Sequence, residues 1–187
     1  MAFPAFLDTC VLYPAYLCDT LLRLAEASAY RPLWSADVLA ELRRNLNERG
    51  ISPERIDRRL AQMTRSFPDA LVAGYDSLTD GMTNHPKDRH VLAAAVRANA
   101  EVVVTFNLKD FPEPALKPYD VEAIHPDEFL LDQLDLYPGL TIDVLRHQAA
   151  AYRRVPNTVP DILVLLERAG VPRFAAEVRR HLEPPAW

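Results

Sequence analysis

The chain has 187 residues, of which 49% are hydrophobic and 25% are charged, and its formal net charge is −5. This composition is that of a folded globular protein, so it excludes the disordered and fibrous classes. No apolar run approaches the roughly 18 residues of a membrane span, and an acid already follows at Asp8. The cysteines Cys10 and Cys18 suit a reducing compartment. We therefore expect a cytoplasmic protein without a secretory leader or a membrane anchor.

Short apolar strands and amphipathic helices alternate along most of the chain. We predict a strand at 5–7, a helix at 16–29, a strand at 33–34, helices at 35–49 and 53–67, a helix from His85, strands at 101–105 and 121–124, and a helix from Pro126. Residues 68–83 show no clear pattern. Alternating strands and helices predict right-handed βαβ units, and therefore an α/β fold with a mostly parallel sheet.

The chain changes character after Tyr137-Pro138-Gly139. No strand pattern follows, and the apolar spacing predicts helices near 140–154, 158–169 and 172–182. Thr158 and Asp161 have the spacing of a capping box at the start of the second of these helices. We expect an α/β domain over 1–137 and a helical C-terminal extension over 138–187.

Several polar residues lie where an α/β sheet places its ligands, at or beyond the carboxyl ends of strands. Asp8 directly follows the first predicted strand, and Asn107 and Asp110 follow the fourth. Glu41 and Asp88 lie on predicted helices, beside the apolar stripe of each helix. Singly, each acid has a simpler explanation, as a turn residue, as a partner of an arginine such as Arg44, or as a helix cap.

Taken together, these acids indicate a cation site. Carboxylates that converge in one crevice repel one another, and burying them unpaired is unfavourable unless a cation lies between them. Hard oxygen ligands favour Mg²⁺ or Mn²⁺ over Zn²⁺. The usual use of such a site is phosphoryl chemistry, in which the metal activates water and stabilises the attacking and leaving oxygens.

The helix predicted at 53–67 has arginines on the side opposite its apolar face. Arg55, Arg58 and Arg65 are spaced so that they share that side. They could contact phosphates or an acidic partner, although a solvated basic face is the simpler interpretation.

Four segments, taken in order, resemble the motifs of PIN-domain ribonucleases. Leu7–Leu12 resembles the opening DT-x-VL motif, and Glu41-Leu42 matches the helical acid of the family. Residues 87–95 resemble the helix that carries the third acid, and residues 104–111 resemble the closing T-x-[DN]…DF segment. The resemblance covers about residues 5–125 and implies a PIN-like three-layer α/β/α fold.

The same resemblance implies a metal-dependent endoribonuclease, most often the toxin of a VapBC-type toxin–antitoxin pair. By match, Asp8, Glu41 and Asp88 are the first three acids. We also predict that Thr9 and Thr105 hydrogen-bond to the carboxylates and support them. The implied partners are single-stranded RNA, a cognate antitoxin and a second copy of the chain in a homodimer. The implied products carry a 5′-phosphate and a 3′-hydroxyl.

The fourth acid departs from the family pattern. Where many members have an Asp two residues after the strand-end threonine, this chain has Asn107, which offers a neutral oxygen. Asp110 has the charge, but a turn through Leu108 and Lys109 would have to bring it back to the site. We predict that Asp110 supplies the charge and that Asn107 orients a water molecule or an acid.

Other functions have less support in the sequence. There is no Walker A motif, no G-x-G-x-x-G loop and no nucleophile elbow, and the five histidines lack metal-ligand spacing among themselves. A receiver-like phosphoacceptor using Asp8 and Lys109 would need an adjacent acid pair that is missing. The alternatives left open are a non-catalytic α/β protein-binding module and a housekeeping PIN nuclease without an antitoxin.

Overall fold

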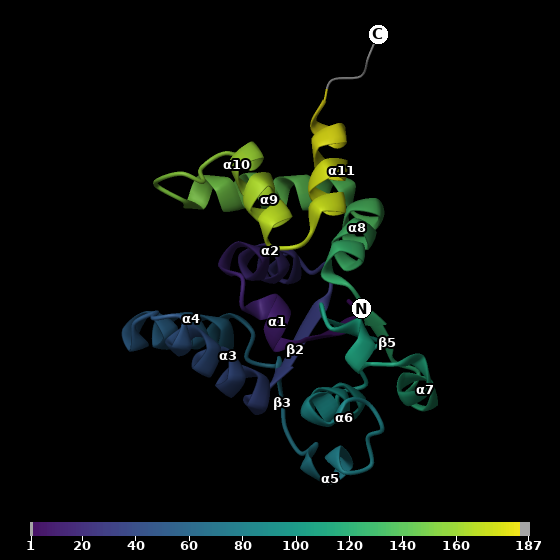
Figure 1. Cartoon of the computed structure of the whole chain (residues 1–187). Coiled ribbons are helices and arrows are strands. Elements are labelled where there is room, and N and C mark those ends of the chain that lie inside the picture. Colours follow the sequence, from purple (N-terminus) through teal and green to yellow (C-terminus); the bar gives the residue numbers. More distant parts are fainter. Residues whose placement is uncertain (1, 184–187) are drawn as a thin grey trace. The chain divides into compact units, whose positions relative to one another are not determined.

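The computed structural model describes residues 2–183, which divide into two compact units (Figure 1). The first unit contains the chain up to Tyr13 and the stretch Tyr30–His125. The second contains Pro14–Ala29 and the chain from Pro126 onward. The packing therefore places the helix from Pro126 with the C-terminal helices, although the sequence pattern changes only after Tyr137.

The first unit is built on a five-stranded, all-parallel sheet in the order β3-β2-β1-β4-β5. Its strands are β1 Pro4–Leu7, β2 Arg31–Ser35, β3 Leu71–Val72, β4 Val102–Val104 and β5 Glu122–Ile124. Phe6 in β1 pairs with Leu33 on one side and with Val103 on the other. All three side chains are buried because a parallel sheet is covered on both faces. The predicted α/β class with a parallel sheet flanked by helices is confirmed.

The strand order reverses between β1 and β4. The chain proceeds from β1 through β2 to β3 on one side, and then returns to lay β4 and β5 on the other side of β1. In open parallel sheets the crevice at such a reversal, beyond the carboxyl ends of the strands, is where ligands bind. Asp8 follows β1 at this point, and its backbone N–H donates to the carbonyl of Val104 in β4 at 3.2 Å.

Helices surround this sheet within the first unit (Figure 1). They are α1 Thr9–Leu12, α3 Ala36–Glu48, α4 Pro53–Ser66, α5 Asp76–Thr79, α6 Arg89–Arg97 and α7 Glu113–Leu116, with 3₁₀ turns η1 Pro86–Asp88, η2 Leu108–Asp110 and η3 Lys117–Tyr119. Ser35 caps α3 as expected, accepting a hydrogen bond from the Val38 N–H at 3.2 Å. Val38, Leu42 and Leu46 form the buried stripe of α3, which fixes the direction of the remaining α3 side chains.

Two local features differ from the sequence prediction. Residues 68–83, which showed no pattern, contain strand β3 and helix α5. A two-residue strand has no periodicity to detect, and β3 forms only by pairing with Trp34 and Ser35 of β2. The helix expected from His85 begins as the 3₁₀ turn η1 and becomes α-helical at Arg89. The first turn therefore follows a tighter path.

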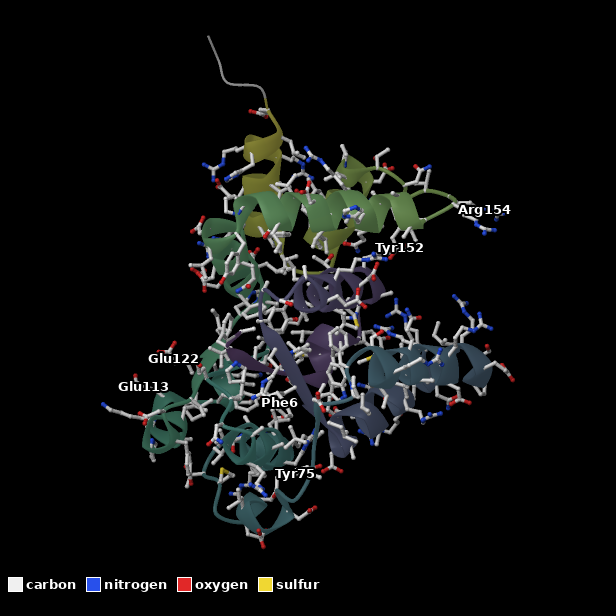
Figure 2. The ribbon with its side chains drawn as sticks, turned by 180° about the vertical axis from the view of Figure 1, so that it is seen from behind. Phe6, Tyr75, Glu113, Glu122, Tyr152 and Arg154 are labelled. Atoms are coloured by element: carbon white, nitrogen blue, oxygen red, sulfur yellow. The ribbon has the colours of Figure 1, made fainter. Side chains whose placement is uncertain are left out.

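The second unit consists of helices: α2 Ala15–Glu26, α8 Pro126–Leu136, α9 Pro138–Ala151, α10 Val159–Arg168 and α11 Pro172–Leu182. Thr158 Oγ1 accepts from the Asp161 N–H at 3.3 Å and donates to the Asp161 carboxylate at 2.7 Å, so the predicted capping interaction is present. Tyr152, at the end of α9, donates to Asp19 of α2 at 2.6 Å, and Arg154 lies at the tip of the loop between α9 and α10 (Figure 2). None of the helices within residues 2–183 is long and apolar enough to cross a bilayer.

Candidate active site

Asp8 is held rigidly where β1 ends and α1 begins. Its side chain is 3% exposed. One carboxylate oxygen caps α1 by accepting from the Thr9 N–H at 2.7 Å, and the other accepts from the Thr105 hydroxyl at 2.7 Å. The Cys10 thiol also donates to that second oxygen at 3.2 Å. Burial raises the pKa of Asp8, although these hydrogen bonds oppose the shift. Asp8 thus both begins a helical turn and brings a desolvated carboxyl group to the reversal point of the sheet.

Glu41 is brought to the same point from α3. The Thr9 hydroxyl donates to Glu41 Oε2 at 3.0 Å, and the half-buried Glu41 contributes to the raised pKa of Asp8 through its negative charge. In the described part of the chain, no ion pair joins Glu41 to Arg44. The interpretation of Glu41 as a partner of that arginine therefore has no support in the structure.

Asp88 is the last residue of η1 and lies beside His85, which precedes that turn. It also lies beside Asp110, the last residue of η2. Potential ligand atoms of the three residues all lie within 4.8 Å of one another. His85 Nδ1 is 3.6 Å from Asp88 Oδ2, and the His85 N–H donates to the carbonyl of Asp110 at 3.0 Å. Burial and the charges of Asp8 and Asp110 raise the pKa of Asp88 to about 6. Among the described residues its side chain makes no capping bond to α6, so a simple capping role is not realised.

The 3₁₀ turn η2 places Asp110 close to Asp88 and His85. η2 runs through Leu108 and Lys109, and Phe111, which follows it, is only 2% exposed and anchors the turn in the core. Asn107 is exposed at the start of η2, and its backbone N–H donates to Thr105 Oγ1 at 3.0 Å. Asp110 therefore belongs to the group of close ligand atoms with Asp88 and His85. Asn107 lies outside that group and lines the cleft.

A cleft of about 600 Å³ in the first unit contains Glu41, Asp88 and Asp110, whereas Asp8 is not among its lining residues. It is lined by Glu41, Arg44, His85, Lys87, Asp88, His90, Asn107, Lys109 and Asp110. Three acids therefore share one space with three long basic side chains. The buried Asp8, Thr9 and Thr105 hold the acidic side of this cleft through the hydrogen bonds described above.

The predicted arginine stripe of α4 is not part of this cleft. Three of its arginines are exposed, and none of the three lines the cleft: Arg55, Arg58 and Arg65. A neighbouring arginine, Arg59, instead donates to the carbonyl oxygens of Leu12 and Tyr13 at the end of α1. The cations at the cleft are Arg44, Lys87 and Lys109, which sequence reasoning did not single out for phosphate contact.

The donor set fits a divalent cation. Carboxyl oxygens of Asp88 and Asp110 and an imidazole nitrogen of His85 are close enough for one ion to contact all three. Burial, and then the negative charges of Asp8 and Asp110, raise the pKa of Asp88, so a cation beside these acids would be favourable. His85 was not among the ligand candidates predicted from the sequence, because the five histidines lack metal-ligand spacing among themselves. The spacing of His85 to Asp88, three residues apart across a proline-started turn, was the available signal.

Two family models match the chain. A family model described as PIN domain matches residues 4–109. The chain belongs to the PIN-domain family. Asp8, Glu41, Asp88 and Asn107 of this PIN domain all lie in the matched region, whereas Asp110 falls just beyond it. A second model, described as VapC50 C-terminal domain, matches residues 126–180. This match begins where the second unit resumes after the PIN domain.

One curated relative of this PIN-domain chain comes from Mycobacterium tuberculosis (strain ATCC 25618 / H37Rv) and is named "Putative ribonuclease VapC50". The two are 55% identical over 111 residues, which is 59% of this chain. The match spans 65% of the relative, slightly less than two thirds of its length. No solved structure matched the chain.

Proposed function

We propose that this PIN-domain protein is a metal-dependent endoribonuclease that hydrolyses RNA phosphodiester bonds, and that it is the toxin of a toxin–antitoxin pair. The observation that carries the proposal is the convergence of Asp88, Asp110 and His85 within 4.8 Å, in a cleft that also contains Glu41. The relative's name, a ribonuclease, and the match to the VapC50 C-terminal domain support the same function.

Asp88, Asp110 and His85 would hold the cation, and Glu41 and Asp8 would add negative charge around it. Carboxylate ligands suit Mg²⁺ and Mn²⁺, and the imidazole of His85 makes Mn²⁺ the better candidate of the two. When bound, such an ion activates water and offsets the charge that develops on a phosphate under attack.

The other residues of the site would have two roles: some position the acids, and others bind the RNA. Thr105 and Thr9 fix the carboxylates of Asp8 and Glu41, so these groups need no reorientation when substrate arrives. Lys87, Lys109 and Arg44 line the cleft and are long enough to contact phosphates on either side of the cleaved bond. A single strand can bend into such a cleft more easily than a duplex, which favours single-stranded RNA.

The remaining features of this proposal rest on the family likeness. These are the 5′-phosphate and 3′-hydroxyl ends of the products, a cognate antitoxin, and assembly as a homodimer. The exposed arginines Arg55, Arg58 and Arg65 would then contact either RNA or an acidic segment of a protein partner. A cytoplasmic location stays a prediction from the sequence.

The test is metal-dependent stability and cleavage measured on the same full-length protein. Mn²⁺ and Mg²⁺ should raise the melting temperature. At a metal concentration of a hundred times Kd, the free energy of unfolding should increase by about 2.7 kcal/mol. They should also support cleavage of single-stranded RNA that EDTA stops. Asp110→Asn should weaken both effects, whereas Asp80→Asn, an exposed acid outside the cleft, should leave both unchanged. A chain that neither gains stability from these ions nor cleaves RNA would be a non-catalytic binding module.

A further inference from the structure

A second cavity, of about 480 Å³, lies next to the candidate active site within the first unit. It is lined by Cys10, Tyr13, Asn45, Glu48 and Arg49, and we call it the Tyr13 pocket. The Cys10 thiol on its wall is the group that donates to Asp8. On α3, Asn45 follows the cleft residue Glu41 by four positions, which is one helical turn or about 6 Å. The linings of the pocket and of the acidic cleft are therefore neighbours on α3.

The Tyr13 pocket presents flat, partly open side chains. The Arg49 guanidinium lies 6.0 Å from the centre of the Tyr13 ring, and its Nη1 donates to the Tyr13 hydroxyl oxygen at 3.4 Å. Tyr13 is half-buried and the guanidinium of Arg49 lies over its ring, whereas Arg49 itself is exposed, so the open planar surface of the pocket is that of Arg49. Aromatic rings and guanidinium planes of this kind are the surfaces on which unpaired nucleic-acid bases stack.

The polar groups of the pocket suit a neutral ligand better than a phosphate. The charge of Glu48 offsets that of Arg49, so the lining has no net formal charge and little attraction for an anion. Among the described residues, no hydrogen bond engages the side chain of Asn45 or of Glu48. An amide and a carboxylate are therefore available to a ligand that has both donors and acceptors.

The backbone around Tyr13 is fixed before any ligand arrives. Its N–H donates to the Thr9 carbonyl at 3.0 Å, and Arg59 from α4 donates to its carbonyl oxygen at 3.4 Å. Arg59 also donates to the carbonyl of Leu12. A backbone held in this way leaves only the side-chain torsions of Tyr13 to be ordered on binding, so more of the contact energy appears as affinity.

We propose that the Tyr13 pocket binds one base of the RNA, next to the phosphodiester that the acidic cleft cleaves, and that the preferred base is guanine. This inference rests on the proposed ribonuclease function and adds a basis for sequence preference to it. The base would stack on the exposed guanidinium of Arg49, which lies over the Tyr13 ring. Guanine presents neighbouring N1–H and N2–H donors that fit the Glu48 carboxylate, and an O6 acceptor for the Asn45 amide.

The first experiment measures binding without cleavage. Labelled oligouridylates that contain a single guanine, adenine or inosine are titrated with the full-length protein in EDTA, and anisotropy reports affinity. The guanine oligonucleotide should bind about tenfold more tightly than oligouridylate alone. Inosine, which lacks the N2 amine, should lose most of this gain. Equal affinity for all of these oligonucleotides, or a preference for adenine, would overturn the assignment.

Matched variants locate the effect. Tyr13→Ala, Glu48→Gln and Asn45→Ala should each reduce the guanine preference, while Tyr13→Phe should keep most of it because the ring remains. Asn47→Ala, on the same helix but outside the pocket, and Tyr119→Ala, an exposed tyrosine elsewhere, should behave like the unaltered protein. Glu48 is exposed and Asn45 is half-buried, so these two variants keep the test valid if Tyr13→Ala fails to fold. A preference that survives both would place the base elsewhere.

Cleavage mapping separates this inference from the proposed function. With Mn²⁺, cuts should fall next to guanine in the unaltered protein and become evenly distributed in Glu48→Gln. Cleavage without any base preference would contradict the pocket and leave the ribonuclease intact. Guanine-specific binding that depends on Tyr13, together with no cleavage under any cation, would support the pocket and contradict the nuclease.

Discussion

The hydroxyl of Thr105 donates a 2.7 Å hydrogen bond to Asp8, and this bond joins the carboxyl ends of the two strands where the sheet order reverses. The same Thr105 oxygen accepts from the Asn107 N–H at 3.0 Å. A continuous chain of hydrogen bonds therefore runs from the buried Asp8 to the turn that carries Asp110. One side chain thus positions acids from two separate segments.

Thr105→Val should damage the site while keeping its shape. The valine leaves Asp8 with one donor fewer and leaves the Asn107 N–H without its acceptor, at a loss of about 1–3 kcal/mol in stability. Because the Thr105 hydrogen bond lowers the pKa of Asp8, its removal should move the acid limb of the pH–rate profile to higher pH. Thr105→Ser should restore both properties. A serine variant as impaired as the valine variant would point to packing of the methyl group instead.

Asp8→Asn should abolish cleavage without unfolding the protein. The amide oxygen can still cap α1 through the Thr9 N–H, whereas the second carboxylate oxygen and its negative charge are lost. We expect a rate at least a hundredfold lower. We expect a cation-free stability equal to or above that of the unaltered chain, since the desolvated charge is removed. RNA cleavage and thermal melting in EDTA measure the two effects, and cleavage at the unaltered rate would remove Asp8 from the site.

Asp110→Asn should reduce metal affinity more than Asn107→Ala does. Asp110 belongs to the group of ligand atoms within 4.8 Å, while Asn107 only lines the cleft. Asn107→Asp should tighten Mn²⁺ binding because it adds a charge to the wall of the same site. Activity against Mn²⁺ concentration ranks the three variants. If Asn107→Ala is inactive while Asp110→Asn retains full activity, Asp110 is only a turn residue.

Asp88 makes the cation-free protein less stable as the pH rises. Its pKa is raised from 3.8 to about 6 in the folded state, so the folded protein binds this proton more tightly than the unfolded chain does. Stability therefore falls between about pH 4 and pH 6 as the proton is lost, and stays lower above that range. Asp88→Asn should match the unaltered protein at pH 4 and exceed it by roughly 1–3 kcal/mol at pH 7.5. Melting curves in EDTA give the difference, and a difference independent of pH would exclude this origin.

Lysines of the cleft, rather than arginines of α4, should dominate contact with the RNA backbone. Lys87 and Lys109 line the cleft, whereas Arg55 and Arg58 lie on an exposed helix face away from it. Replacing both lysines with alanine should lower the slope of log affinity against log salt by more than one. Replacing both arginines should change it less. The opposite ranking would move the RNA path onto α4.

The sheet and the acidic residues could be predicted because they depend on strong local patterns. The apolar run before Asp8 and the β-branched run Val102–Val104 have the composition of buried strands of a parallel sheet. The carboxyl ends of parallel strands lie at the same edge of the sheet, so the acids that follow these two strands are expected to lie close together. The turn that returns Asp110 could also be predicted, because Phe111 had to reach the core.

Other features could not be predicted because they depend on contacts distant in sequence. Strand β3 exists only through its pairing with β2, and the role of His85 depends on where η1 and η2 meet. Arg59 looks like its neighbouring arginines in sequence, yet only Arg59 reaches the carbonyls at the end of α1. Periodicity indicates which side of a helix is polar, but not which polar residue has a neighbour.

The chain passes between its two units at residues 13/14, 29/30 and 125/126. Deleting the C-terminal helices therefore removes only part of the second unit and leaves its first segment behind. Helix α2 is encoded inside the PIN-domain sequence, but it packs on α9 and α10, and Thr20 donates to Gln148 at 2.8 Å. A fragment ending at His125 would retain α2 without the helices α9 and α10 that contact it. In such a fragment α2, which lies between the first two strands in sequence, would expose apolar surface to solvent. We expect the fragment to aggregate.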